Sequence, residues 1–333
     1  MIEIRNLTKR FGAATAVDDL SFQVNPGEVL GFLGPNGAGK STTMKMVTGF
    51  LSPTSGKVLV DGKNVASKPI AAKSLIGYLP EGAPLYPDMT PRSLLEFVAE
   101  ARGIAASERA DRIADAVRRV QLEDVLEQRI ETLSKGFKRR VGLALAIVHD
   151  PPVLILDEPT DGLDPNQKEQ VRDLIREMSG EKVIVLSTHI LEEVEAVCTR
   201  AIIIADGRLL FDGKPTELRQ RSRYYGAVEV ALEDAPTDAA RQLESVGGVA
   251  RVETLGTEGN VARFLALPQE GAKPFADVHR LVEEAGWNLR DIHVDRGRMD
   301  DVFREVTGAS RPSGAPTAPA ETDTVTETQG VTP

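Results

Sequence analysis

The chain contains a single cysteine, Cys198, among 333 residues, and aromatic residues make up only 5% of it. A lone cysteine excludes an intramolecular disulfide, and in its apolar helical stretch packing is the more common role. The sequence also lacks an apolar run of the ~20 residues that a membrane-spanning helix needs. The longest candidate, residues 141–148, is bounded by Arg140 and His149. We therefore expect no membrane-spanning segment.

Positive charge is in deficit, because 40 Lys and Arg residues face 50 Asp and Glu residues, for a formal net charge of -10. An acidic chain is a poor general binder of nucleic acid, so we expect no nucleic-acid partner. The N-terminus carries charge from Glu3 onward and lacks the apolar core of a signal peptide. These features indicate a cytoplasmic protein, and the hydrophobic fraction of 41% is ample for a core.

Strand and helix patterns alternate over the first two thirds of the chain, which predicts an α/β fold with a parallel sheet covered on both faces. Charged helical patterns between 91 and 131 indicate a helical subdomain over about 88–150. We expect buried strands at residues 28–33, 76–80, 153–156, 182–187 and 201–205 and helices at 136–148, 165–178 and 190–197. Together these elements form a predicted first domain, residues 1–220.

The pattern changes after about residue 220. The order of the elements becomes β-α-β-β-α-β, which is the split pattern of a ferredoxin-like domain, with a short helix at 299–306 that closes it. We predict a small α+β domain over residues 221–307. Residues 308–333 are rich in Pro, Thr, Ala, Gly and Glu, a composition that predicts a disordered tail.

A glycine-rich segment, GPNGAGKST, lies directly between a predicted strand and a predicted helix. It fits the phosphate-binding P-loop, Gly-x-x-x-x-Gly-Lys-Ser, in the context that this motif requires. The backbone N–H groups would surround phosphates, Lys40 would reach the β- and γ-phosphates, and Ser41 would offer its hydroxyl to Mg²⁺. A plain glycine-rich turn is the alternative, which the context disfavours. The nucleotide-binding residues predicted here are Gly34, Pro35, Asn36, Gly37, Ala38, Gly39, Lys40, Ser41 and Thr42.

Two carboxylates, Asp157 and Glu158, follow the apolar strand at 153–156. Burying a carboxylate costs on the order of several kcal/mol, unless a partner or metal offsets this cost. Without the P-loop, a solvated turn would be the better interpretation. With it, we expect Asp157 to face Mg²⁺ and Glu158 to act as the general base toward the attacking water.

Residues 1–220 resemble the ATP-binding subunits of ABC transporters. VLILDEP resembles their Walker B motif, and DGLDP at 161–165 resembles their D-loop, which implies that Asp164 belongs to the nucleotide site. His189 in STHI stands where the family has its switch histidine, which contacts the γ-phosphate. Phe11 in RFG stands at the position of the aromatic residue that stacks on adenine.

Two positions depart from the common pattern of that family. The signature is usually Leu-Ser-Gly-Gly-Gln, whereas residues 133–137 are LSKGF; the resemblance implies that Ser134 and Gly136 bind the γ-phosphate held by the other subunit. Phe137 cannot donate the hydrogen bonds of a Gln. Glu81 replaces the usual glutamine of the Q-loop, and its carboxylate can still coordinate Mg²⁺. Both variants resemble a subfamily that pairs with separate ABC-2-type permeases, including gliding-motility types.

The resemblance implies an enzyme that hydrolyses ATP with Mg²⁺. It also implies a homodimer, or a pair with a paralogue, in which the signature of one subunit completes the site of the other. A separate multi-span membrane permease would dock near residues 81–104, which would place the chain on the inner face of the cell membrane, for export. The alternatives are a soluble ABC-type ATPase that acts on a macromolecular partner and a slow regulatory subunit. A single ATPase domain, without a long coiled coil in residues 43–132, favours transport.

Overall fold

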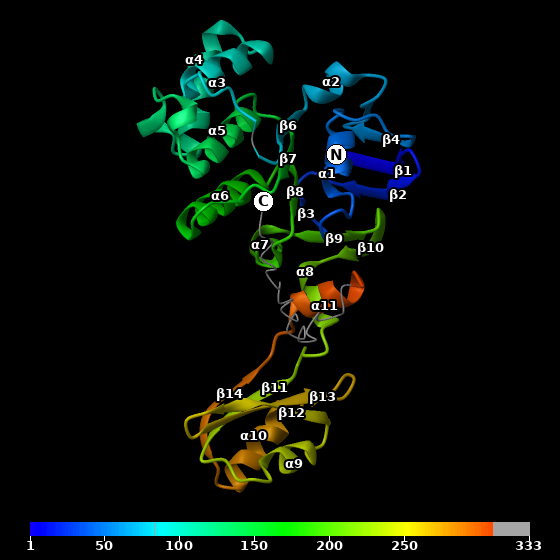
Figure 1. Cartoon of the computed structure of the whole chain (residues 1–333), viewed down its shortest axis with the longest axis vertical. Helices are drawn as coiled ribbons and strands as arrows, with labels where there is room; N and C mark the ends of the chain where they lie inside the picture. Colours follow the sequence, from blue (N-terminus) through cyan, green and yellow to red (C-terminus); the bar gives the residue numbers. More distant parts are fainter. Residues whose placement is uncertain (83, 309–333) are drawn as a thin grey trace, which may run out of the picture.

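The computed structural model describes residues 1–82 and 84–308. Figure 1 shows a large upper part, a narrow neck and a small lower part. The predicted disordered tail lies outside the described residues, apart from Gly308. Within the described part of the chain, every helix is too short or too polar to cross a bilayer.

A six-stranded sheet forms the centre of the upper part, in the order β10-β9-β3-β8-β7-β6. The five strands from β9 to β6 run parallel, and β10 pairs with β9 antiparallel through the predicted hairpin. Every residue of β3 and β7 is buried, as expected for strands covered on both faces. The strands are β3 (Val29–Leu33), β6 (Ile76–Leu79), β7 (Val153–Asp157), β8 (Val183–Thr188), β9 (Arg200–Ala205) and β10 (Arg208–Gly213).

A second, antiparallel sheet packs against one face of the central sheet, in the order β2-β1-β4-β5. Apolar side chains such as Ile4, Leu20, Phe32 and Met44 form a shared core between the two sheets and α1. The elements on this side are β1 (Ile2–Phe11), β2 (Ala14–Val24), α1 (Lys40–Val47), β4 (Ser55–Val60), β5 (Lys63–Asn64) and α2 (Pro69–Lys73).

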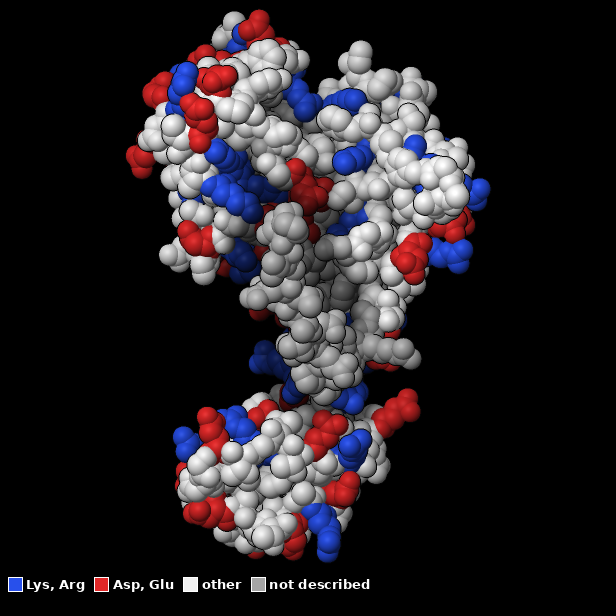
Figure 2. All heavy atoms as spheres, viewed as in Figure 1, with Lys and Arg blue, Asp and Glu red and all other residues white. Residues whose placement is uncertain are grey.

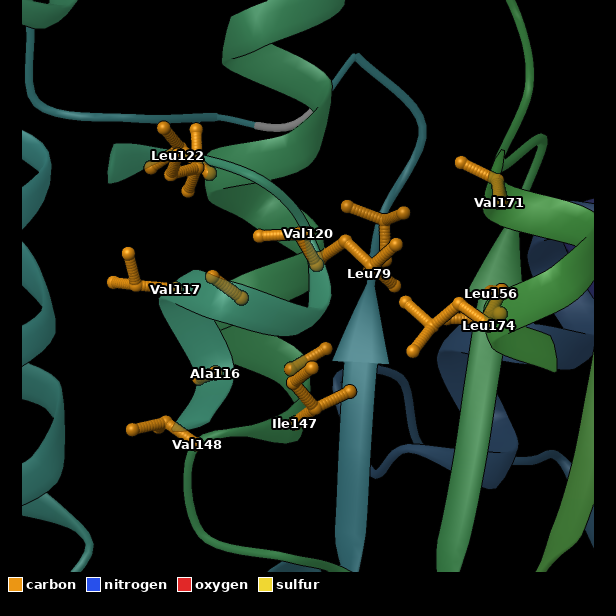
Figure 3. Close-up of a cluster of buried hydrophobic side chains, with 14 of the residues drawn as sticks. Leu79, Ala116, Val117, Val120, Leu122, Ile147, Val148, Leu156, Val171 and Leu174 are labelled. Carbon is orange, nitrogen blue, oxygen red and sulfur yellow. The ribbon is translucent and has the colours of Figure 1, made fainter. Parts of the chain in front are cut away.

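The helical lobe, residues 91–147, lies on the other side of the sheet (Figure 1). Its core continues into the sheet: Val117 and Ile147 belong to the same buried cluster as Leu79, Leu156 and Leu174 (Figure 3). This continuity ties the lobe to the carboxyl-end residues of β6 and β7. The elements are α3 (Pro91–Ala101), α4 (Ala106–Arg119), η1 (Glu123–Val125), η2 (Ile130–Thr132) and α5 (Lys135–Ile147), followed by α6 (Pro165–Met178).

The last helix, α11 (Met299–Val306), packs in a different place from the one expected. The sequence order places it at the end of the small domain, but in the structure it contacts α8 (Pro215–Gln220). Its buried Met299 and Val302 join a cluster with Leu191 of α7 (Leu191–Val197) and Leu218 of α8. The helix packs outside the small domain because its apolar residues are buried against these partners in the upper part.

The lower part has the predicted ferredoxin-like order of elements. Its four strands pair antiparallel in the order β12-β13-β11-β14. Helices α9 and α10 supply apolar residues to a core against this sheet. The elements are β11 (Val228–Glu233), α9 (Ala239–Glu244), β12 (Val249–Glu258), β13 (Val261–Pro268), α10 (Phe275–Glu284) and β14 (Asn288–Val294). The fold class is therefore confirmed, and the domain boundaries stay predictions.

Candidate active site

Three adjacent parallel strands deliver the candidate residues to one edge of the central sheet. Leu33 at the end of β3 pairs with Thr188 at the end of β8, and Asp157 at the end of β7 pairs with Ser187. The chain continues from these ends into the P-loop, His189 and Glu158. Carboxyl ends of parallel strands are the usual place for ligands in open α/β sheets.

The P-loop is shaped by glycines that a larger residue could not replace. Gly39 has a φ of 101°, and a Cβ there would lie 2.4 Å from the backbone oxygen of Ala16. A Cβ on Gly34 would lie 2.5 Å from the backbone oxygen of Ile204. The loop therefore presses its backbone against two neighbouring segments, and α1 begins immediately after it with its free N–H groups.

Lys40 is the first residue of α1 and is buried. Its Nζ donates to the backbone oxygens of Gly34 at 2.6 Å and Pro35 at 3.1 Å, so the ammonium lies over the loop. Burial lowers the pKa of Lys40, while the negative charges of Glu158, Asp157 and Glu81 act in the opposite direction. Ser41 and Thr42 follow in the first turn of the helix, half-buried.

The two predicted carboxylates have different surroundings. Asp157 is 2% exposed and accepts a hydrogen bond from the Ser187 hydroxyl. Glu158 has a φ of 51°, and its amide donates to the Ser187 backbone oxygen at 3.1 Å. Burial raises the pKa of Glu158, against the lowering effect of His189, whose Nδ1 lies 2.9 Å from Glu158 Oε1. The structure thus brings Glu158 and His189 together.

Glu81 follows β6, the strand next to β7. Burial raises the pKa of Tyr78 to about 12, and the charges of Asp157 and Glu81 add to that shift. The negative charges of Glu81 and Asp157 both oppose the lowering of the Lys40 pKa. The two carboxylates therefore belong to the same electrostatic environment. Figure 2 shows basic and acidic side chains together around the hollow between the helical lobe and the rest of the upper part.

Phe11 ends β1 and is 51% exposed. Lys9 Nζ lies 5.0 Å from the ring centroid. Stacking of a base requires an accessible aromatic face. The exposed ring of Phe11 meets this requirement.

Ser134, Gly136 and Asp164 form a separate group at the starts of α5 and α6. Ser134 caps α5 by accepting from the Phe137 amide at 3.2 Å, and Asp164 caps α6 by accepting from the Gln167 amide at 2.9 Å. A Cβ on Gly136 would lie 2.5 Å from Gln167 Oε1. Across residues 1–82 and 84–308, no hydrogen bond or ion pair joins this group to Lys40.

The sequence interpretation missed two buried polar residues near the site. Arg139 of α5 donates to the backbone oxygens of Asp157 and Glu158. Glu193 of α7 accepts from Thr160, two residues after Glu158. The one available signal was the position of Arg139 and Arg140 directly before the apolar run of α5, residues 141–147.

The protein family described as "ABC transporter" matches residues 17–161. Nod factor export ATP-binding protein I of Paraburkholderia xenovorans is 38% identical over 308 residues, which cover 92% of this chain and 97% of that protein. The uncharacterized ABC transporter ATP-binding protein YhcH of Bacillus subtilis is 32% identical over 316 residues, 93% of this chain and 97% of that protein. ABC transporter A family member 1 of Dictyostelium discoideum is 33% identical, and the chain spans only 34% of its length.

Solved structures resemble about two thirds of this chain. One described as an ATP binding subunit of an ABC transporter has a TM-score of 0.62 and 32% identity, covering 66% of this chain and 92% of that one. The cbiO1 protein of Clostridium perfringens, part of an ABC transporter complex, has a TM-score of 0.60 and 29% identity, covering 66% of this chain and 90% of that one. A dimeric bacterial ABC transporter cassette shares the fold, with a TM-score of 0.60 and 24% identity, over 65% of this chain and 99% of that one.

Proposed function

This chain belongs to the ATP-binding subunits of ABC transporters, and on that premise we propose how its site hydrolyses ATP and which partners it drives. The contact between Glu158 and His189, at the strand edge that also carries Lys40, is the single observation on which the mechanism rests. ATP binding and hydrolysis are the activity of this family, and the residue roles below are the proposal.

Lys40 and the P-loop receive the phosphates. The Lys40 ammonium is held by two backbone oxygens of the loop. These neutral oxygens can be replaced by phosphate oxygens, because a hydrogen bond between an ammonium and an anionic oxygen is stronger than one to a neutral carbonyl. The loop amides and the N-terminus of α1 add positive potential at the same place. Phe11 stacks on the adenine ring, since its exposed face suits any flat base.

The donors beside Lys40 fit Mg²⁺. The Ser41 hydroxyl and the carboxylates of Asp157 and Glu81 are hard oxygen ligands, which Mg²⁺ prefers. In the described part of the chain, no three His, Cys, Asp or Glu side chains form a group that could hold a metal ion. Mg²⁺ is commonly held by one or two carboxylates, keeps several waters and shares its other ligands with nucleotide phosphates. When bound, the ion neutralises charge that develops on the phosphates.

Glu158 takes the proton from the attacking water. Burial raises its pKa, which makes the carboxylate a stronger base toward the attacking water. His189 holds the carboxylate through its Nδ1 and directs its other ring nitrogen to the γ-phosphate. Asp157, fixed by the Ser187 hydroxyl, serves the metal rather than the water.

Two protomers share each site. Ser134, Gly136 and Asp164 sit at the starts of α5 and α6, apart from Lys40, so they serve the nucleotide of a second protomer. A head-to-tail dimer with two-fold symmetry places each signature over the partner's P-loop. The second protomer is another copy or a paralogue. The shared fold with a cassette solved as a dimer supports this arrangement.

A separate ABC-2-type permease docks on the face that carries α2 and α3 (Figure 1). Exposed large apolar side chains support the proposal that this face binds a protein partner. Ile70, for example, is 86% exposed. A groove, here called the docking groove, lies between the segment after β6 and the start of α5. Its lining includes Pro84, Leu85, Pro87, Ile130 and Lys138. The other exposed apolar residues of this face are Phe50, Tyr86 and Phe97.

The chain then lies on the inner face of the cell membrane, held by the permease. Relatives named Nod factor export ATP-binding protein support export as the direction. The test is to tag the chain in its native cell and identify what copurifies. A multi-span membrane protein that stimulates ATP hydrolysis is the expected result. A ribosomal or DNA-bound partner, with no membrane protein, would replace transport with the macromolecular alternative.

A further inference from the structure

A single guanidinium contacts four backbone oxygens around the candidate site. Arg139 of α5 is 6% exposed. It donates to the oxygens of Asp157 and Glu158, to that of Pro80 at 3.0 Å and to that of Pro159 at 3.4 Å. Arginine can do this because its five N–H groups form a fixed fork. One side chain therefore connects segments that lie far apart in the sequence.

Those segments have distinct parts in the proposed reaction. Residues 157–159 carry the metal-binding carboxylate and the general base. Pro80 directly precedes Glu81 at the end of β6, and Arg139 itself follows Ser134 on α5. Arg139 also lines the docking groove together with Leu85. The guanidinium is thus in contact with both the permease-facing groove and the main chain of the base.

The backbone of Glu158 needs such support. Its φ of 51° lies in the left-handed region, which is strained for any residue with a Cβ. The Ser187 backbone oxygen holds its amide, and Arg139 holds its carbonyl. With both backbone groups fixed, the Glu158 side chain points at His189.

We propose that Arg139 is a positioning residue, which fixes the main chain of Glu158 and transmits movement of the docking groove to that carboxylate. The inference rests on the proposed function, because it presumes that Glu158 is the base. Among the described residues, no carboxylate forms an ion pair with Arg139, so its bonds go to main-chain atoms that move only with their segments. A shift of α5 or of Pro80 would therefore move the main chain of Glu158 through Arg139.

The next residue offers a matched control. Arg140 is also on α5 and is 8% exposed. It donates to the Gln121 backbone oxygen and to Gln170 Oε1, and its guanidinium lies 5.5 Å from the Phe137 ring centroid. Its contacts therefore connect α5 with the rest of the helical lobe and with α6, without involving residues 157–159.

The experiment compares Arg139→Lys, Arg139→Gln and Arg140→Lys with the wild type, through kcat, KM for ATP and the folded fraction. Lysine keeps the charge but cannot hold four carbonyls. We expect Arg139→Lys to lower kcat about tenfold or more, because small misplacements of a catalytic group are costly. KM should change less than about twofold, since Phe11 and the P-loop are untouched, and Arg139→Gln should be slower still. Arg140→Lys should lose thermal stability yet keep kcat within about twofold.

Equal kcat per folded molecule in Arg139→Lys and Arg140→Lys would overturn the positioning role. A wild type that neither binds nor hydrolyses ATP would instead reject the proposed function. The transmission step has its own test, a double-mutant cycle with Leu85→Ala. We expect Leu85→Ala to change kcat in the wild type and to have no further effect in Arg139→Lys. Additive effects, or no effect in the wild type, would show that Arg139 does not transmit movement of the docking groove to Glu158.

Discussion

Nδ1 of His189 lies 2.9 Å from Oε1 of Glu158, and this contact joins the ends of the neighbouring parallel strands β8 and β7. The pairing of these strands is what brings a histidine and a carboxylate, far apart in the sequence, within hydrogen-bonding distance. Lys40 follows β3, the strand on the other side of β8. The site is thus built from three consecutive strand ends.

Replacing Glu158 with Gln should slow ATP hydrolysis by ~10²–10⁴-fold, which is the usual loss when a general base is removed. ATP affinity should remain near that of the wild type, because Lys40 and the P-loop are intact. Single-turnover hydrolysis and equilibrium binding separate the two effects. Full ATPase activity in this variant would show that Glu158 is not the base.

Replacing Lys40 with Ala should reduce turnover at least ~10²-fold, since it removes the preorganised charge that faces the phosphates. Lys45 is the control, because it lies one turn later on α1 and is exposed. Lys45→Ala should retain activity. Phosphate release by the two purified variants decides the matter, and equal activity of Lys40→Ala and the wild type would refute the P-loop assignment.

Replacing Phe11 with Ala should weaken ATP binding by ~1–3 kcal/mol, the range measured for stacking of a base on an aromatic ring. Phe11→Tyr should bind as tightly as the wild type, because its ring keeps the same π-face. Phe97→Ala is the control, since that ring is also exposed but lies on α3. Titration calorimetry with ATP gives the comparison, and an unchanged affinity in Phe11→Ala would place adenine elsewhere.

Stability should fall in mild acid because of His149. Burial, with the positive charge of Arg102, lowers the pKa of His149 to about 4 from the usual 6.5. Its Nδ1 has no hydrogen-bond partner among the described residues, and its Nε2 lies 3.2 Å from the Ile76 backbone oxygen. The unfolded chain takes up a proton below pH 6.5 and the folded chain does not, so the loss of stability grows from about pH 6.5 to about pH 4.

The loss from this group should be about 2 kcal/mol, allowing for its partial exposure to solvent. His149→Gln keeps a donor for the Ile76 oxygen and does not titrate. Urea unfolding at pH 7.5 and pH 4.5 should therefore show a smaller difference in the variant than in the wild type. Identical pH dependence in the two proteins would mean that His149 titrates normally.

Local signals in the sequence were enough to predict some of these features and not others. The spacing of the P-loop and the acids after an apolar strand predict Lys40, Asp157 and Glu158 without any structure. Phe11 and Glu81 were accessible only through resemblance, since an isolated aromatic or acidic residue carries no signal of its own. The contact between Glu158 and His189 depends on strand neighbours, which periodicity does not specify.

Long-range packing accounts for the features that sequence reasoning missed. Periodicity identifies α5 as an apolar helix but does not reveal that Arg139 reaches the main chain of Glu158. The same limit applies to α11: the short helix was predicted, whereas the partners of Met299 and Val302 come from α7 and α8, earlier in the chain. The packing partners of both helices are determined by tertiary contacts and not by proximity in the sequence.

The central claim, that two protomers share each site, is tested most directly by the molar mass of Glu158→Gln in light scattering with Mg²⁺ and ATP. We expect a dimer with ATP and a monomer with ADP, because slow hydrolysis traps the closed state. Adding Ser134→Arg should abolish the dimer, since it blocks the contact of α5 with the partner's phosphate. A dimer that forms equally well with Ser134→Arg, or Glu158→Gln that remains monomeric with ATP even beside its permease, would contradict the shared site.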